Sequence, residues 1–209
     1  MTEKSKEEPE EIKVILIGDS GVGKTNLINT SVGLEFDDGK KPTISGSFLE
    51  KIVDINGNKY SINLWDTAGQ EAYRGVTKLF FKGSDIVILV YDITNIESFK
   101  SLEEWFKIST EIIDNKFIYG VVGNKNDLYL HCQVKEEDAK NFAQAKGSKI
   151  KFVSAKEDPQ SFVDFLIELV KEFKQIDNDE KKKFVKLKEG DNDEEKERKS
   201  CFGCMNRKN

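Results

Sequence analysis

The chain alternates short apolar runs with amphipathic segments over most of its length, and the two patterns predict different elements. Several runs are continuously apolar, which is typical of strands that are buried on both faces of a sheet. Two others flank Asn56-Gly57, a pair that favours a tight hairpin turn. The predicted strands are residues 12–17, 47–55, 59–65, 85–91, 117–122 and 150–153.

Apolar residues at helical spacing occupy segments between and after these strands. Phe99, Leu102, Phe106 and Ile113, for example, form one stripe that predicts a single helix over residues 96–113. Strands that alternate with helices favour right-handed crossovers. We therefore expect an α/β fold with a six-stranded, mostly parallel sheet, one antiparallel edge strand and helices on both faces. The predicted helices are residues 24–32, 96–113, 135–146 and 159–175.

Both ends of the chain lack this patterning. Residues 1–11 hold five acids and two lysines, and residues 177–209 hold nine acids and ten bases with few large apolar groups. Such a composition favours a disordered arm and a disordered tail around one globular domain, residues 12–176. The formal net charge of −5 argues against a nucleic-acid partner, which requires a basic face. No apolar run approaches the roughly 20 residues of a membrane span.

The segment Gly18-Asp-Ser-Gly-Val-Gly-Lys24-Thr25 is a complete phosphate-loop motif between a predicted strand and a predicted helix. Glycines let the backbone wrap a phosphate, and the helix N-terminus adds partial positive charge. Lys24 would reach the β- and γ-phosphates, and the Thr25 hydroxyl would bind Mg²⁺. An accidental glycine-rich turn is the alternative, which the neighbouring elements disfavour. The residues expected to bind phosphate are Asp19, Ser20, Gly21, Val22, Gly23, Lys24 and Thr25.

A second motif, Trp65-Asp-Thr-Ala-Gly-Gln-Glu71, ends a predicted strand. Asp66 could hold Mg²⁺ through water opposite the phosphate loop, and Gly69 could bring a backbone N–H onto a γ-phosphate. Gln70 could orient an attacking water, which makes it the candidate catalytic residue. Taken alone, an aspartate after a strand is more often a helix cap or a turn residue, but a phosphate loop in the same chain favours the metal site.

A third motif, Asn124-Lys-Asn-Asp127, follows another predicted strand and indicates which base is bound. The Asp127 carboxylate can accept hydrogen bonds from N1–H and from the 2-amino group of guanine, whereas adenine offers neither donor. Ser154-Ala-Lys156 would close the base pocket from the other side. A polar turn is the alternative for the tetrapeptide by itself. The expected guanine-binding residues here are Asn124, Lys125, Asp127, Ser154, Ala155 and Lys156.

These blocks, in this order and spacing, resemble the small GTPase superfamily of Ras-like proteins over roughly residues 11–176, and the Rab branch in particular. The resemblance implies the P-loop NTPase fold and a monomeric switch that binds GTP or GDP with Mg²⁺, hydrolyses GTP and regulates vesicle or membrane traffic. It also implies effectors, a GAP, an exchange factor and prenyl-carrier or GDI-type partners. The Rab-like features besides the motifs above are Phe80-Phe-Lys-Gly83, Leu89-Val-Tyr-Asp-Ile-Thr94, Glu97-Ser-Phe99 and the C-terminal cysteine pair.

The same resemblance implies roles for two residues of the loop over 33–46. Thr43 would bind Mg²⁺ through its hydroxyl and the γ-phosphate through its N–H, and Phe36 would pack against guanine. The segment Ser45-Gly-Ser47 departs from the usual Rab pattern, which carries an acid before the phenylalanine. This departure leaves open a second function, that of a nucleotide-locked or soluble signalling adaptor with negligible GTP turnover.

Cys201 and Cys204 stand near the end of the chain. By the resemblance, geranylgeranyl groups on these cysteines would hold a cytoplasmic protein on the cytosolic face of an endomembrane or the plasma membrane. Five residues follow Cys204, and there is no C-a-a-X box. Unmodified tail cysteines, and a zinc site with His131 and Cys132, are therefore the alternatives.

Overall fold

A computed structural model of the chain describes residues 8–39, 43, 47–67 and 80–177. The chain divides into two compact units, residues 1–171 and 172–209. Within the second unit the described residues, 172–177, are helical. Most of the predicted N-terminal arm and nearly all of the predicted tail fall outside the described residues, so the proposed domain boundaries stay predictions.

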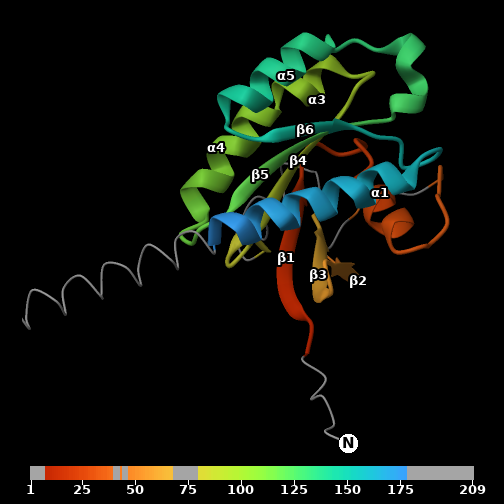
Figure 1. Ribbon diagram of the computed structural model, residues 1–209. Helices are drawn as coiled ribbons and strands as arrows, with labels where there is room; N and C mark the ends of the chain where they lie inside the picture. Colours follow the sequence, from red (N-terminus) through yellow and green to blue (C-terminus); the bar gives the residue numbers. More distant parts are fainter. Residues whose placement is uncertain (1–7, 40–42, 44–46, 68–79, 178–209) are drawn as a thin grey trace, which may run out of the picture. The chain divides into compact units, whose positions relative to one another are not determined.

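Six strands form one sheet in the order β2-β3-β1-β4-β5-β6 (Figure 1). The pairs β1·β3, β1·β4, β4·β5 and β5·β6 are parallel, and β2·β3 is antiparallel. The predicted α/β fold with a mostly parallel sheet and an antiparallel edge is therefore confirmed. The strands are β1 (Glu10–Ile17), β2 (Ser47–Ile55), β3 (Asn58–Asp66), β4 (Ile86–Asp92), β5 (Ile118–Asn124) and β6 (Lys149–Phe152).

The predicted hairpin turn joins β2 to β3. Asn56 and Gly57 have φ values of 56° and 84°, the left-handed conformation that a tight two-residue turn requires. The Gly57 N–H donates to Asp54 Oδ1 at 2.9 Å, and Ile55 pairs with Asn58. The turn sequence thus sets the register of the antiparallel edge.

Helices connect the strands, and one prediction among them was wrong. The expected single helix over 96–113 is divided at Ser101 into two helices. Ser101 Oγ donates to the Glu97 carbonyl at 3.0 Å, and Glu104 N–H donates to the Ser101 carbonyl, a tightened i to i+3 bond. The helices are α1 (Lys24–Ser31), α3 (Ile96–Lys100), α4 (Leu102–Ile112), α5 (Glu136–Ala145), the short 3₁₀ helix η2 (Asn126–His131) and residues 159–177.

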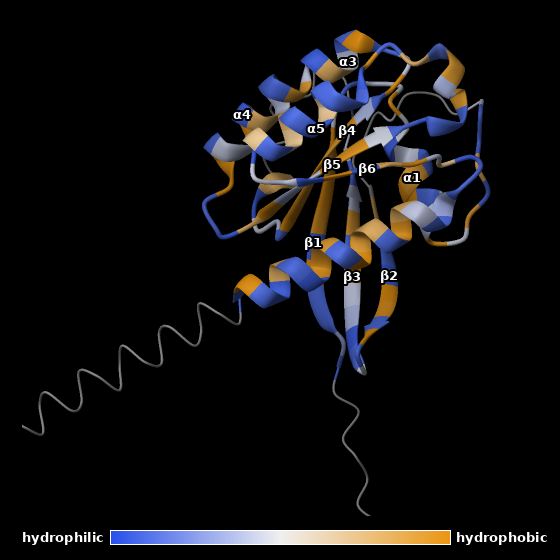
Figure 2. Ribbon diagram, turned by 45° about the horizontal axis from the view of Figure 1, so that its top comes forward, coloured by the Kyte–Doolittle hydropathy of each residue, from blue (hydrophilic) through white to orange (hydrophobic). Residues whose placement is uncertain are grey.

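Alternate side chains of the central strands face opposite layers of helices, and Figure 2 shows these strands as apolar ribbons between them. Leu89 and Tyr91 of β4 pack in one apolar cluster with Trp105 of α4. On the opposite face the last helix comes so close to β5 that a Cβ at Gly120 would lie 2.6 Å from Leu169 Cδ1. The central strands β4 and β5 are therefore covered on both sides, whereas the edge strand β2 exposes Phe48 and Ile52.

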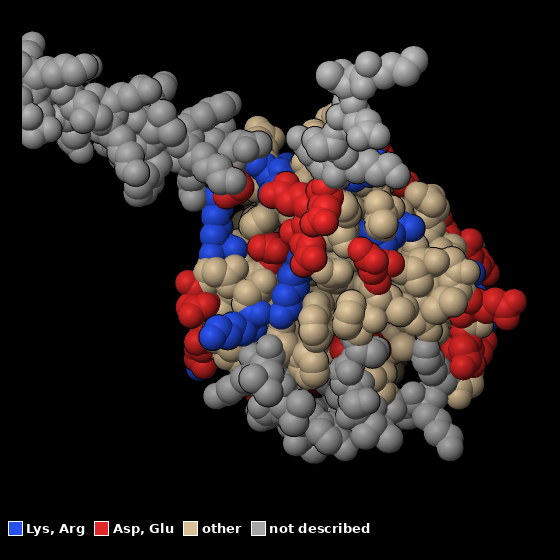
Figure 3. All heavy atoms as spheres, turned by 90° about the horizontal axis from the view of Figure 1, so that it is seen from below, with Lys and Arg blue, Asp and Glu red and all other residues tan. Residues whose placement is uncertain are grey.

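Acidic and basic side chains share the face of the molecule shown in Figure 3, where acidic ones gather near the centre. Within the described residues, no helix combines the length and apolar character that crossing a bilayer requires. The large apolar side chains at the surface of this part are Leu34, Phe48, Ile52, Leu128, Tyr129 and Leu130. Of the three on η2, Leu128 also lines a cavity at the ends of the strands.

Candidate nucleotide-binding site

A cavity of about 530 Å³ opens where β1, β3 and β5 end. Its walls come from the segments that follow these strands, from the loop after α1 and from the segment after β6, at the edge of the sheet where ligands bind in open parallel sheets. Sequence motifs far apart in the chain therefore meet at one place. The predicted site residues that line it are Ser20, Gly21, Gly23, Lys24, Thr25, Phe36, Thr43, Asn124, Lys125, Asp127, Ala155 and Lys156.

The phosphate loop links β1 to α1 and depends on its glycines for shape. Gly18, Gly21 and Gly23 have φ values of 146°, 81° and 97°, which side-chain-bearing residues rarely adopt. A Cβ at Gly18 would lie 2.1 Å from the Val90 carbonyl oxygen, and one at Gly23 would lie 2.4 Å from Asn124 Nδ2. The loop thus packs against β4 and β5 with no room for side chains at these two positions.

Lys24, the first residue of α1, lies folded back over this loop. Its ammonium donates to the carbonyl oxygens of Gly18 at 2.7 Å and Asp19 at 2.9 Å. Only 5% of the residue is exposed, and this burial lowers its pKa to about 8, although the charges of Asp66 and Asp19 act in the opposite direction. The cation is therefore held at the cavity wall by the carbonyl oxygens of its own loop.

Three oxygen atoms meet beside Lys24 at the end of β3. Thr25 Oγ1 lies 2.7 Å from Thr43 Oγ1 and donates to Asp66 Oδ2 at 2.7 Å, and Thr43 Oγ1 donates to the same carboxylate oxygen at 3.4 Å. Hydroxyl and carboxylate oxygens suit Mg²⁺, which is usually held by one or two carboxylates together with substrate phosphates and water. Elsewhere in the described part of the chain there is no cluster of three or more histidines, cysteines or acids.

The expected base-reading carboxylate, Asp127, is held by the buried Ser154, which does not itself line the cavity. Ser154 Oγ donates to Asp127 Oδ1 at 2.6 Å, and the same hydroxyl accepts from the Glu157 N–H at 2.9 Å. This bond orients the Asp127 carboxylate in the wall of the cavity, where it can accept hydrogen bonds from a base.

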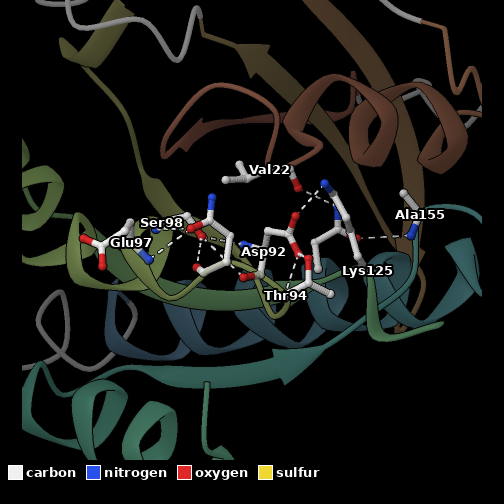
Figure 4. Close-up of polar contacts among 9 residues, drawn as sticks. Val22, Asp92, Thr94, Glu97, Ser98, Lys125 and Ala155 are labelled. Carbon is white, nitrogen blue, oxygen red and sulfur yellow. Dashed lines mark hydrogen bonds and ion pairs between the residues drawn. The ribbon is translucent and has the colours of Figure 1, made fainter. Parts of the chain in front are cut away.

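Asn124 ties the phosphate loop to the segment after β6, and Figure 4 labels its two partners, Val22 and Ala155. Its amide donates to the Val22 carbonyl at 2.8 Å and accepts from the Ala155 N–H at 3.3 Å, and the residue is 2% exposed. Asn124 also lines the cavity, so its predicted contact with guanine stays a prediction, while its amide joins the phosphate loop to the segment after β6.

Lys125 follows in the left-handed conformation, with φ of 64°. Its ammonium pairs with Asp92 Oδ2 at 2.5 Å, and the other carboxylate oxygen accepts from the N–H and hydroxyl of Thr94 (Figure 4). Asp92 was missed by the sequence reasoning. The signal available in the sequence was its position at the carboxyl end of a buried strand. That this end lies next to the end of β5 is known from the structure.

Phe36 and Lys156 lie across the base end of the cavity from different loops. Lys156 Nζ is 5.8 Å from the centroid of the Phe36 ring and 3.3 Å from Asp38 Oδ2. Asn26 of α1 donates to the Asp37 carbonyl at 2.9 Å, which holds the Phe36 loop against the helix. Phe36 therefore lines the cavity, and its predicted packing against guanine stays a prediction.

Two further candidate residues, His131 and Cys132, are described by the structure, and four are not. Cys132 is exposed and its thiol donates to the Val134 carbonyl at 3.0 Å, and His131 ends η2. The other candidates lie outside the described residues: Gly69, Gln70, Cys201 and Cys204. Their proposed roles therefore rest on the sequence.

Comparison with known proteins places the chain in a family. The sequence model of the Ras family matches residues 13–175. The chain is 39% identical over 166 residues to the Ras-related protein Rab-30 of Homo sapiens, which covers 78% of this chain and 82% of that protein. It is 40% identical over 153 residues to the GTP-binding protein yptV5 of Volvox carteri, with 70% and 75% covered.

A third relative is the Ras-related protein Rab-22A of Canis lupus familiaris, 39% identical over 135 residues, which are 65% of this chain and 70% of that protein. Members of this family bind GTP and GDP, typically with Mg²⁺, as the cavity and its oxygen ligands suggest. The chain therefore belongs to the Ras family as a divergent Rab-type small GTPase, a GTP-hydrolysing switch of membrane traffic.

Proposed function

We propose that the cavity binds the guanine nucleotide as a switch, with Lys24 and the phosphate loop on the phosphates and Asp127 on the base. The observation that carries this proposal is the contact between the hydroxyls of Thr25 and Thr43 at 2.7 Å. These residues are 18 positions apart, and Thr43 belongs to the loop after α1. A group that binds Thr25 at the phosphates would thus also hold or release this loop.

Mg²⁺ would be held by Thr25, Thr43 and, through water, Asp66. When bound, the ion supplies charge neutralisation between the β- and γ-phosphates. Lys24 would add a second positive charge beside these oxygens, and the loop N–H groups would orient the phosphates. Catalysis on this scheme is positioning and electrostatics, with Gln70 orienting the attacking water.

Release of the γ-phosphate would remove the partner of Thr43 and of the Gly69 N–H. The two loops would then lose their shared contacts, which is an order-to-disorder switch. Effectors would bind the form in which both loops are held, while a GAP and an exchange factor would control its lifetime. The chain is proposed to act as a monomer on a cytosolic membrane face, attached through Cys201 and Cys204 and carried by a prenyl-carrier or GDI-type protein.

Single-turnover hydrolysis of bound GTP tests this function. Wild type should convert GTP to GDP and phosphate, and Gln70→Leu should slow the conversion while the affinity for GTP stays near that of wild type, because the side chain acts on the water. Equal rates for the two proteins would remove Gln70 from the mechanism. Tight GTP binding with no turnover in wild type would instead favour the signalling adaptor.

A further inference from the structure

Helix α4 contacts the phosphate loop through one hydrogen bond that the motifs do not include. The indole N–H of Trp105 donates to Asp19 Oδ1 at 2.8 Å, across 86 positions of the chain. Trp105 is 6% exposed and belongs to the apolar cluster beneath α4. The carboxylate of Asp19 is thus bound behind the loop, whereas the next two residues, Ser20 and Gly21, line the cavity.

The backbone of Asp19 is bound from the other side by the phosphate-binding lysine. Lys24 Nζ donates to the Asp19 carbonyl at 2.9 Å, so one residue joins α4 to the ammonium that faces the nucleotide. Movement of Asp19 would change the position of Lys24 as well as the shape of the loop.

Helix α4 is itself held firmly enough to serve as an anchor. Ser109 Oγ lies 2.7 Å from Tyr119 Oη on β5, and Glu103 pairs with Lys146 at 2.6 Å just after α5. The helix is therefore fixed to the sheet and to the neighbouring helix independently of the phosphate loop.

We propose that Trp105 is a positioning residue for phosphate binding, which acts through Asp19 to hold the loop in the shape that retains the nucleotide. This inference rests on the proposed nucleotide site and adds to it a residue from outside the motifs. A hydrogen bond to a carboxylate is stronger than one between neutral groups, and its removal leaves a charge without its donor. Loss of the indole N–H should therefore loosen the loop more than loss of apolar packing alone.

The rate of GDP dissociation from the full-length protein tests the proposal. Trp105→Phe keeps an aromatic ring and removes the donor, and it should release GDP about tenfold faster than wild type, the size expected for a lost charge-assisted hydrogen bond. Thr110→Val is the matched control, because the exposed Thr110 hydroxyl donates to the Phe106 and Lys107 carbonyls of the same helix and takes part neither in the Trp105–Asp19 bond nor in the contacts that anchor α4. Its release rate should equal that of wild type.

A double-mutant comparison distinguishes positioning through Asp19 from an effect of Trp105 packing alone. Asp19→Asn keeps an acceptor for the indole but carries no charge, so Trp105→Phe added to Asp19→Asn should accelerate release by only about two- to fivefold, the effect of losing a neutral hydrogen bond. The proposal would be overturned if Trp105→Phe accelerated release tenfold in the Asp19→Asn protein as well. It would also be overturned if Trp105→Phe alone did not accelerate release.

Asp19→Ala provides a second route in case Trp105→Phe does not fold. It removes the acceptor and leaves the buried indole N–H without its partner, and it should also accelerate GDP release. An unchanged rate would contradict the proposal. Failure of the wild-type protein to bind GDP would count against the nucleotide site itself and is distinguishable from either result.

Discussion

Ser154 donates its hydroxyl proton to Asp127 at 2.6 Å and so joins two loops that lie 27 positions apart. The bond occupies one oxygen of the carboxylate and leaves the residue in the wall of the cavity. A carboxylate held in this way can accept from two donors on one edge of a base, which guanine provides. We therefore expect base selection to depend on this pair of residues from different motifs.

Asp127→Asn should exchange the preference for guanine nucleotides for one for xanthine nucleotides. Xanthine carries a carbonyl where guanine has its 2-amino group, and an Asn amide can donate to that carbonyl, whereas a carboxylate cannot. Competition binding of GTP against XTP measures the change. Asp54→Asn, next to the β2–β3 turn and far from the cavity motifs in the chain, is the control and should still prefer GTP. If Asp127→Asn also still prefers GTP to XTP, Asp127 does not read the base.

The affinity of the nucleotide-free protein for GDP should fall as the pH rises through about 8. Burial lowers the pKa of Lys24 to about 8 despite the nearby carboxylates of Asp66 and Asp19, and only the protonated lysine attracts phosphate. Below that pH the free protein already carries the charge, so this group adds no dependence there.

Measurement of the GDP dissociation constant from pH 6.5 to 9.5 checks this expectation. Lys24→Arg stays charged throughout the range and should lose the slope above pH 8, whatever its absolute affinity. Parallel profiles for wild type and Lys24→Arg would assign the dependence to another group.

Tyr91→Phe should leave the protein as stable as wild type or stabilise it by about 1 kcal/mol, because a buried hydroxyl without a partner opposes folding. Tyr91 is fully buried, its hydroxyl has no hydrogen-bond partner among the described residues, and burial raises its pKa. Tyr119→Phe is the matched comparison, since its hydroxyl bonds to Ser109.

That comparison variant should lose about 1 kcal/mol, the typical net contribution of one hydrogen bond. Urea unfolding of the GDP-bound proteins gives both values. Destabilisation of Tyr91→Phe by as much as Tyr119→Phe would mean that the Tyr91 hydroxyl is satisfied in solution.

Replacing Cys201 and Cys204 by Ser should move the protein from the membrane fraction to the soluble fraction while its nucleotide affinity stays unchanged. One lipid chain anchors only marginally, whereas two chains, or one chain with a basic patch, hold a protein stably. Arg198, Lys199 and Arg207 bracket the cysteines and would add attraction to an anionic leaflet.

Membrane fractionation and intact mass spectrometry of the protein from cells measure this outcome. A mass equal to that of the bare polypeptide, together with unchanged fractionation of the double variant, would contradict lipid attachment.

The sequence by itself determined which segments along the chain form strands and helices, with one exception at Ser101, and which chemistry to expect at the ends of the strands. The phosphate-loop glycines, Lys24 and Asp127 stand in short motifs whose meaning depends on neighbouring residues, so spacing along the chain was sufficient. The buried strands were visible for the same reason, because apolar runs such as the one before Gly18 are local patterns.

Only the tertiary structure decided which residues act through one another. The bonds from Trp105 to Asp19 and from Lys125 to Asp92 join segments that meet because β1, β4 and β5 are neighbours in the sheet. The break at Ser101 escaped the helical pattern because an apolar stripe continues through it, while a side-chain hydroxyl bonded to a carbonyl tightens the backbone there. Hydrogen bonds depend on distance and direction in space, and neither can be read from the spacing of residues along a chain.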